Sequence, residues 1–267
     1  MNFFPNAKIN LGLNITERRT DGFHNIESIF VPILWRDELE IIESNQTSFA
    51  SSGIIIPGNA ADNLCLKAYY LLKSEHDLPS VRIHLKKNIP IGAGLGGGSS
   101  DAAFVIKGLN ELFQIGLTVS QMQNFARKLG SDCAFFIQNK PVFSFGKGDE
   151  FEDINLELKD KFIVLVYPNE HISTAMAYSG VKPKFPQYSL KSIIEMPMKD
   201  WREFMINDFE TSIFKQVPRL LKIKQELYAA GAIYAAMSGS GSTLFGIFDS
   251  NPPVIKMKDT KIHICKL

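Results

Sequence analysis

The residues best suited to chemistry lie in one glycine-rich segment, PIGAGLGGGSSDAA, at residues 90–103. Five glycines and two serines stand there between a strand-like run, VRIHL, and a strongly helical one. Backbone N–H groups in such a turn can approach an anion closely, because few side chains stand in the way. The helix that follows directs its partial positive charge at the same place. The segment predicts a phosphate-binding loop, and the alternative is a glycine-rich surface linker.

The residues of this loop fit neither a P-loop nor a protein-kinase glycine loop, and they fit a dinucleotide-binding motif only in part. A P-loop needs Lys and Ser/Thr after its second glycine, whereas Gly98 is followed by Ser99 and the loop holds no lysine. A protein-kinase glycine loop needs HRD and DFG downstream, and neither string occurs. Gly92, Gly94 and Gly97 match G-x-G-x-x-G, but a dinucleotide-binding fold also needs an acidic residue about 20 positions on, at the end of a second strand. We therefore expect a long polyphosphate loop whose serine hydroxyls can reach phosphate oxygens or Mg²⁺.

Composition narrows the class of protein and its surroundings. The chain has 267 residues, 29 Lys and Arg against 28 Asp and Glu, and a net charge of +1, which gives no reason to expect a nucleic-acid partner. Its three cysteines, Cys65, Cys133 and Cys265, fit neither a disulfide framework nor a zinc pattern, so we expect a reducing cytoplasm. The first residues lack a signal-peptide pattern and no apolar run approaches about 18 residues. We expect a soluble, untargeted protein without a membrane span.

The first half of the chain predicts a β-rich region followed by helices around the loop. Residues 7–15, AKINLGLNI, alternate as a strand does, with Lys8 and Asn10 on the polar face. A turn, RRTDGFH, precedes two further strand patterns, and helical spacing begins after an exposed stretch, at residues 62–74. The helix after the loop has Gly116 as its stop, and a capping box at Thr118 and Gln121 begins another that ends at Gly130.

The second half predicts a second, smaller unit. Asp132 follows the expected helix end at Gly130 and precedes AFFI, which we interpret as a buried strand. A carboxylate at a helix C-terminus is unfavourable for stability, because the helix dipole is negative there. Asp132 therefore has either a functional role or the role of a turn-forming residue. A hairpin over residues 145–158 leads into the strand FIVLVYP, a helix from Ser173, a helix from Pro218, the SGSGS turn between two strands, and a terminal strand. We expect an α+β protein of two domains, residues 1–155 and 156–267.

Four ordered segments, PNAKINLGLN, PIGAGLGGGSSDAA, LGSDCAFF and MSGSGSTLF, resemble the GHMP family of small-molecule kinases over nearly the whole chain. The resemblance implies a two-domain GHMP-kinase fold, with a β-rich N-terminal α/β domain and a smaller, ferredoxin-like α+β C-terminal domain. It implies transfer of the γ-phosphoryl group of ATP, with Mg²⁺, to a hydroxyl. PxAKINL and DGxH resemble one branch of this family, and that resemblance implies that the acceptor is the 2-hydroxyl of a cytidine-diphosphate conjugate of methylerythritol, in non-mevalonate isoprenoid biosynthesis.

The same resemblance assigns roles to individual residues. Asp132 matches the acid that takes the hydroxyl proton, and Lys8 the lysine beside it. Ser100 is the candidate hydroxyl near Mg²⁺, whose other ligands the sequence leaves unknown. Asn63 and Lys87 match positions near the adenine and ribose of ATP. The residues that match the phosphate-binding loop are Pro90, Ile91, Gly92, Ala93, Gly94, Leu95, Gly96, Gly97, Gly98, Ser99 and Ser100.

The cytidine end of the acceptor matches a pocket of rings. Phe23 and Tyr178 match the two rings that hold the pyrimidine, and His24 the group that bonds its edge. Tyrosine is usual where this chain has Phe23, so a hydroxyl is lost while stacking remains. Asn10 and Thr174 match further substrate contacts.

Several alternatives remain at this point. Another small-alcohol kinase of the mevalonate or homoserine type would need no pyrimidine pocket, and a catalytically silent nucleotide-binding protein would not need Lys8 and Asp132. An NAD-binding dehydrogenase would place the loop after its first strand, whereas β-patterned residues precede it here. We expect a monomer or a weak homodimer.

Overall fold

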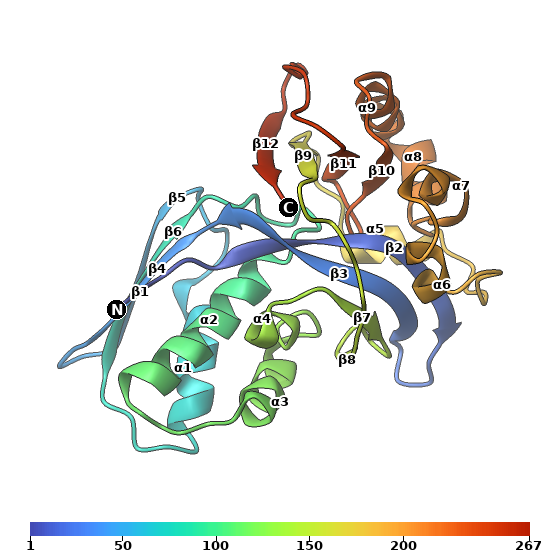
Figure 1. Ribbon diagram of the computed structural model, residues 1–267. Helices are drawn as coiled ribbons and strands as arrows, with labels where there is room; N and C mark the ends of the chain where they lie inside the picture. Colours follow the sequence, from blue (N-terminus) through green and yellow to red (C-terminus); the bar gives the residue numbers. More distant parts are fainter. The chain divides into compact units, whose positions relative to one another are not determined.

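The computed structural model describes residues 1–267, which pack as two compact units built from separated segments (Figure 1). Unit 1 comprises Met1–Ala7, Trp35–Ile91 and Gly96–Lys140, and unit 2 comprises Lys8–Leu34, Gly92–Leu95 and Pro141–Leu267. Each unit contains helices and strands, so the predicted α+β class is confirmed. The division into residues 1–155 and 156–267 concerns contiguous domains and stays a prediction. No helix combines the length and apolar character needed to cross a bilayer.

Unit 1 contains a four-stranded sheet in the order β1-β4-β6-β5. Its strands are β1 (Asn2–Phe3), β4 (Glu38–Glu43), β6 (Val81–Lys87) and β5 (Ser48–Gly53). Strand β6 pairs antiparallel with β4 and parallel with β5. Strand β6 contains the expected strand VRIHL, and its burial alternates, with Val81, Ile83 and Leu85 inside.

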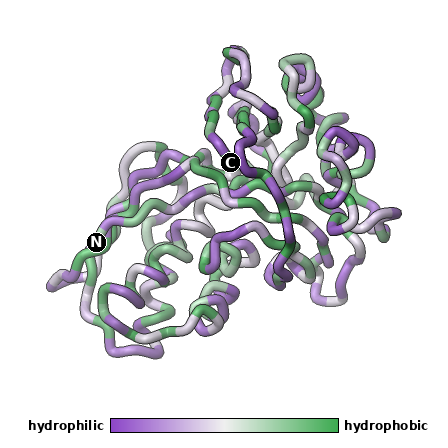
Figure 2. The backbone as a smooth tube through the Cα atoms, in the orientation of Figure 1, coloured by the Kyte–Doolittle hydropathy of each residue, from purple (hydrophilic) through white to green (hydrophobic).

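Four α-helices complete unit 1: α1 (Leu64–Lys73), α2 (Gly97–Leu112), α3 (Val119–Leu129) and α4 (Phe135–Gln138), with a short 3₁₀ turn, η1 (Ala60–Asp62), before α1. Helices α1 and α2 pack side by side, and both contact α3. Along α1 to α3 hydrophobic and hydrophilic segments alternate, as expected for helices that bury one face (Figure 2). The expected capping box is present, since Thr118 Oγ1 accepts the Gln121 N–H and the Gln121 side chain accepts the Thr118 N–H.

Unit 2 holds two sheets. The first, in the order β2-β3-β7-β8, contains β2 (Asn6–Arg18), β3 (His24–Arg36), β7 (Val142–Phe145) and β8 (Glu150–Asp153), where β7 and β8 form the expected hairpin. The second is antiparallel throughout, in the order β10-β11-β9-β12, with β9 (Phe162–Tyr167), β10 (Tyr234–Met237), β11 (Leu244–Phe248) and β12 (Lys261–Lys266).

The helices of unit 2 are α5 (Thr174–Ser179), α6 (Leu190–Ile194), α7 (Trp201–Phe204), α8 (Glu210–Gln216) and α9 (Pro218–Ala229), with the 3₁₀ turn η2 (Met198–Asp200) before α7. Helix α9 packs on β10 and β11, and its buried residues Leu220, Ile223 and Leu227 join one core with Val164 and Leu244 (Figure 1). This core holds the strands β9, β10 and β11 together, and the turn between β10 and β11 carries the SGSGS residues.

Four expectations from the sequence are wrong in detail. AFFI is the helix α4 and not a strand, and the exposed stretch before α1 contains the edge strand β5. Helix α2 ends at Leu112, before Gly116. Both faces of β2 are buried from Asn6 to Ile15, where the sequence predicts one polar, exposed face; Lys8 is only 3% exposed.

Candidate active site

The glycine loop joins β6 to α2 and has the backbone geometry that glycine permits. Gly92, Gly94 and Gly96 have φ values of 64°, 78° and 67°, in the left-handed region. Gly96 caps α2 without a side-chain hydrogen bond, so no side chain of the cap residue accepts the N–H groups of the first turn. A helix of 16 residues that begins in this way favours an anion at its N-terminus.

The middle of the loop is held within unit 2 by the turn at residues 238–242. Ser238 Oγ donates to the Gly94 carbonyl oxygen at 2.8 Å, and the Thr243 N–H donates to the Ala93 carbonyl oxygen at 3.2 Å. A Cβ at Gly94 would overlap the Ser238 carbonyl oxygen. The loop and the SGSGS turn, predicted as separate motifs, therefore form one backbone structure at this point.

A buried ion cluster lies at the two ends of the loop, in unit 1. The Lys87 ammonium pairs with the carboxylates of Asp37 and Asp101, the latter at 2.7 Å, and all three side chains are at most 3% exposed. Asp37 Oδ1 also accepts the N–H groups of Asn88 at 2.6 Å and Ile89 at 2.8 Å. Because Lys87 ends β6 and Asp101 lies in α2, the cluster joins the chain on either side of the phosphate-binding loop.

Burial and the charge of the opposite partner have opposing effects on the pKa values of Asp101 and Lys87. Desolvation raises the pKa of Asp101 to about 8, while the Lys87 ammonium lowers it. Desolvation lowers the pKa of Lys87, but the Asp101 and Asp37 carboxylates outweigh it, so that pKa is raised. The expected contact of Lys87 with ATP stays a prediction; its ammonium is already engaged by two carboxylates. Sequence reasoning did not find Asp37 or Asp101, because neither local pattern signals a partner 50 or 14 residues away.

The serines at the start of α2 lie differently from each other. Ser100 is fully buried, and its Oγ has no hydrogen-bond partner in the structure. Ser99 is half-buried and bonds to the thiol of Cys133, whose pKa burial raises to about 12. A buried hydroxyl without a hydrogen-bond partner, as in Ser100, is expected where a bound ligand supplies the missing partner.

Lys8 and Asn10 lie next to each other in unit 2. Lys8 Nζ donates to Asn10 Oδ1 at 2.6 Å and lies 4.6 Å from the centre of the Phe30 ring. Asn10 Nδ2 donates in turn to Ser28 Oγ at 2.9 Å. The Lys8 N–H donates to the Leu95 carbonyl oxygen at 2.9 Å, so the structure brings Lys8 together with the middle of the loop.

Asp132 and Asn63 belong to unit 1. Asp132 is half-buried in the turn between α3 and α4, and its pairing with Lys8 stays a prediction. Asn63 is the N-cap of α1, where its Oδ1 accepts the Cys65 N–H at 2.9 Å. That role accounts for the residue type, while its contact with ATP stays a prediction.

The ring residues of the expected pyrimidine pocket lie in unit 2. His24 begins β3 and stacks on Tyr178 with ring centres 4.6 Å apart and an angle of 22° between the planes. Tyr178 lies in α5, which begins at Thr174. Desolvation, followed by the Arg18 charge, lowers the pKa of His24, which favours a neutral ring that can bond a base edge. The structure thus brings His24 and Tyr178 together.

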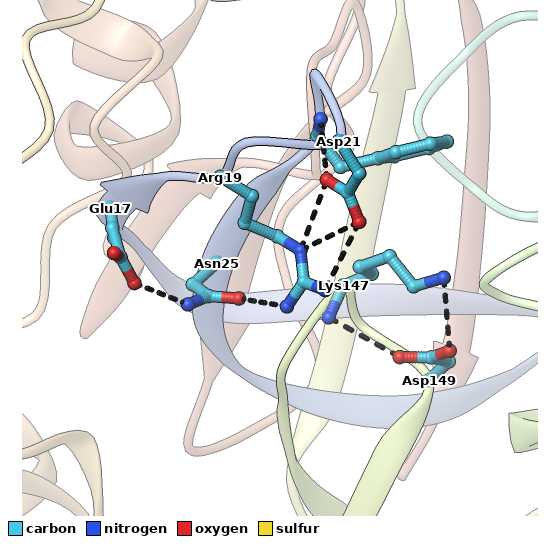
Figure 3. A network of polar contacts seen from close by, with 7 residues as sticks. Glu17, Arg19, Asp21, Asn25, Lys147 and Asp149 are labelled. Atoms are coloured by element: carbon cyan, nitrogen blue, oxygen red, sulfur yellow. Dashed lines mark hydrogen bonds and ion pairs between the residues drawn. The ribbon is translucent and has the colours of Figure 1, made fainter.

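Phe23 projects from the turn before β3 and is 55% exposed. Figure 3 shows Arg19 between Asp21 and Asn25 in this turn. Arg19 pairs with Asp21 at 3.0 Å and donates to Asn25 Oδ1 at 2.9 Å. Asp21 Oδ1 also accepts the Phe23 N–H at 3.1 Å. Lys147 Nζ lies 5.3 Å from the centre of the Phe23 ring. An exposed aromatic ring held in this way is available for stacking.

Comparisons with known proteins agree with this arrangement. The family model "GHMP kinases N terminal domain" matches residues 63–140, and "GHMP kinases C terminal" matches residues 189–259. A solved mevalonate kinase from Methanococcus jannaschii covers 100% of this chain and 98% of its own with a TM-score of 0.71; at 15% identity it shows the fold alone. The chain belongs to the GHMP kinase family, and the expected GHMP-kinase fold is confirmed.

More similar relatives share one name. A 4-diphosphocytidyl-2-C-methyl-D-erythritol kinase of Cytophaga hutchinsonii is 49% identical over 98% of this chain and 97% of its own, and one of Bacteroides fragilis is 52% identical over 95% and 94%. A crystal structure of 4-(cytidine 5'-diphospho)-2C-methyl-D-erythritol kinase has a TM-score of 0.80 at 31% identity, and covers 94% of this chain and 91% of its own. Within the family, the chain groups with these kinases.

Proposed function

We propose that the chain transfers the γ-phosphoryl group of ATP to the 2-hydroxyl of 4-diphosphocytidyl-2-C-methyl-D-erythritol, a step of isoprenoid precursor synthesis. The observation that supports this function most strongly is the sequence identity of 49–52%, over 95–98% of the chain, to relatives named for this activity. The left-handed glycines and the open N-terminus of α2 are what a triphosphate requires. As a member of a kinase family, the chain uses ATP.

The loop at residues 90–100 binds the phosphates in this proposal. Its backbone N–H groups and the dipole of α2 stabilise negative charge without a lysine in the loop. Mg²⁺ fits as well, because Ser100 Oγ is a buried oxygen without a partner. The structure has no group of three or more His, Cys, Asp or Glu side chains placed to hold a metal ion, and Mg²⁺ would take further ligands from phosphates and water. Held there, Mg²⁺ would neutralise charge on the phosphate oxygens.

Asp132 takes the proton of the 2-hydroxyl as that oxygen forms its bond to the γ-phosphorus. The bond from the γ-phosphorus to the bridging oxygen breaks, and ADP leaves with the electron pair. Lys8, which Asn10 Oδ1 and the Phe30 ring hold in place, contributes positive charge to the reacting groups. General-base help of this kind is worth about 10²- to 10⁴-fold in rate.

The pyrimidine lies between Phe23 and Tyr178 in this proposal, and His24 bonds its edge. Phe23 is exposed and braced, and His24 and Tyr178 are already in contact. Asn10 and Thr174 contact the remainder of the acceptor. Stacking on one aromatic ring is worth about 1–3 kcal/mol in nucleic-acid binders.

We further propose that the protein acts in the cytoplasm on this small molecule, as a monomer or weak homodimer without a nucleic-acid partner. Its three free cysteines, two of them buried, and its net charge of +1 support this.

A coupled assay of ADP release tests the function. Purified protein is given ATP and Mg²⁺ with the cytidine conjugate, with mevalonate, with homoserine, or with no acceptor. We expect release only with the conjugate. Release with mevalonate or homoserine alone would support another small-alcohol kinase, and ATP binding without release for any acceptor would support a silent nucleotide-binding protein.

A further inference from the structure

The segment at residues 205–210, MINDFE, connects two parts of unit 2 that carry site residues. On one side it runs parallel to β2: the Leu13 N–H donates to the Ile206 carbonyl oxygen at 2.9 Å, and the Asp208 N–H to the Leu13 carbonyl oxygen at 2.8 Å. Asp208 Oδ2 also accepts the Ile15 N–H at 2.7 Å. Because β2 carries Lys8, this segment is fixed to the catalytic strand.

On its other side the same segment holds the end of β10. Asn207, which is 2% exposed, donates from Nδ2 to the carbonyl oxygens of Met237 and Gly239, each at 2.8 Å. Asn207 Oδ1 accepts the Phe209 N–H at 3.0 Å. Glu210 Oε1 accepts the Met237 N–H at 2.7 Å. The carboxamide of Asn207 thus uses both its donor and its acceptor groups on backbone.

The backbone that Asn207 holds is the backbone that holds the loop. Between the two carbonyl groups lies Ser238, whose Oγ donates to the Gly94 carbonyl oxygen at 2.8 Å and accepts the Asn10 N–H at 3.3 Å. Gly239 lies against the same place, since a Cβ there would be 3.2 Å from Asn10 Oδ1. Displacement of residues 237–239 would therefore move the contact at Gly94.

We infer that Asn207 is a positioning residue for ATP: its carboxamide fixes residues 237–239, and through Ser238 the middle of the phosphate-binding loop. This inference rests on the proposed function. Asn207 touches no phosphate; it sets where the loop N–H groups point. A displacement of about 1 Å in such a site can cost about 10²-fold.

Two substitutions at this position separate positioning from packing. Asn207→Ala leaves two buried carbonyl groups without donors. Asn207→Asp keeps the shape but offers one donor only while protonated, and an ionised carboxylate would face two carbonyl oxygens. Those neighbours raise the pKa of the new carboxyl above its ordinary value, so its hydrogen bond is present at low pH and lost as pH rises through that pKa.

The matched control is Tyr228→Phe, which removes the hydrogen bond from Tyr228 Oη to the Ala235 carbonyl oxygen on the same strand and leaves residues 237–239 untouched. A second test variant, Ser238→Ala, removes the hydroxyl that donates to the Gly94 carbonyl oxygen and accepts the Asn10 N–H, and it leaves the Asn207 side chain in place. It keeps the inference open to refutation should Asn207→Ala fail to fold.

The experiment measures KM for ATP, KM for the cytidine conjugate, and the melting temperature of each full-length variant, with binding of a non-hydrolysable ATP analogue measured separately. We expect Asn207→Ala and Ser238→Ala to raise KM for ATP and the analogue Kd by about 10- to 100-fold, and KM for the conjugate far less. The double variant, Asn207→Ala with Ser238→Ala, should lose little more affinity for ATP than Asn207→Ala alone, because both substitutions act through the contact of Ser238 with Gly94. Relative to wild type, kcat/KM for ATP of Asn207→Asp should fall as pH rises.

Wild-type affinity for ATP in Asn207→Ala or in Ser238→Ala would overturn the inference, as would an equal loss in Tyr228→Phe. A fall in melting temperature without a change in either KM would make Asn207 purely structural and would also overturn it. If the wild-type protein releases no ADP with the conjugate, the proposed function fails, and the analogue Kd still decides whether Asn207 positions the loop.

Discussion

Replacement of Lys87 by methionine tests the buried cluster at the ends of the phosphate-binding loop. The substitution keeps an unbranched side chain of similar length and removes the charge that faces Asp37 and Asp101. With side chains at most 3% exposed, neither carboxylate can turn to water without movement of the backbone. Removing one partner of a buried ion pair costs about 3–5 kcal/mol, because an uncompensated charge remains.

The cost should depend on pH, because a proton can replace the lost ammonium. Burial already raises the pKa of Asp101 to about 8, and loss of Lys87 removes the charge that opposes this rise. A carboxyl group whose pKa is higher in the folded state stabilises the fold below its unfolded pKa, and this stability is lost as pH rises. The loss of stability in Lys87→Met should therefore be smaller near pH 5, where Asp101 binds a proton, than above pH 8, where it is ionised.

The assay is urea unfolding at several values of pH, checked by thermal melting. A loss of about 3–5 kcal/mol corresponds to roughly 6–20 °C in a protein of this size. The control Lys87→Met with Asp101→Asn removes one of the two unpaired charges and should recover part of the loss, while Asp37 keeps its bonds to the N–H groups of Asn88 and Ile89. A difference below about 0.5 kcal/mol at pH 8, or one independent of pH, would refute the reasoning.

Three further predictions concern the site. Asp132→Asn should lower kcat by about 10²- to 10⁴-fold and leave the Kd of an ATP analogue nearly unchanged, since it removes a base and keeps the shape; full turnover would remove Asp132 from the mechanism. Phe23→Ala should raise KM for the cytidine conjugate by roughly 5- to 150-fold, as expected from the loss of one stacking ring, and equal effects on KM for ATP would place Phe23 outside the pocket. Gly94→Ala should lower the free energy of unfolding, because its Cβ would overlap the Ser238 carbonyl oxygen. Gly98→Ala, in α2 and with the nearest atom 4.0 Å from its Cβ, should raise the free energy of unfolding by up to about 1 kcal/mol. Urea unfolding distinguishes the two, and equal changes would contradict the geometry.

Local patterns in the sequence were sufficient for most elements and for the loop. Period-two alternation predicted β2, a strand-like run predicted β6, a capping box predicted α3, and the glycines predicted a turn with few side chains before α2. Each of these signals lies within a few residues of the feature that it specifies, so no knowledge of the fold was needed.

The features that were missed depend on residues far apart in the chain. Strand β5 consists mostly of exposed, small residues and pairs with β6. AFFI is apolar without a period that distinguishes a short helix from a buried strand. The ion cluster of Asp37 and the backbone contacts of Asn207 require tertiary pairing over 50 and 30 residues, and no local pattern announces them.

In the proposed function, Lys8 and Asp132 both act on the acceptor hydroxyl. Kinetics of Lys8→Met, Asp132→Asn and the double variant test it most directly, because residues that act together show strongly non-additive effects on kcat. We expect the double variant to be about as slow as the slower single variant. Losses that multiply in the double variant, or a single variant with wild-type kcat, would contradict it.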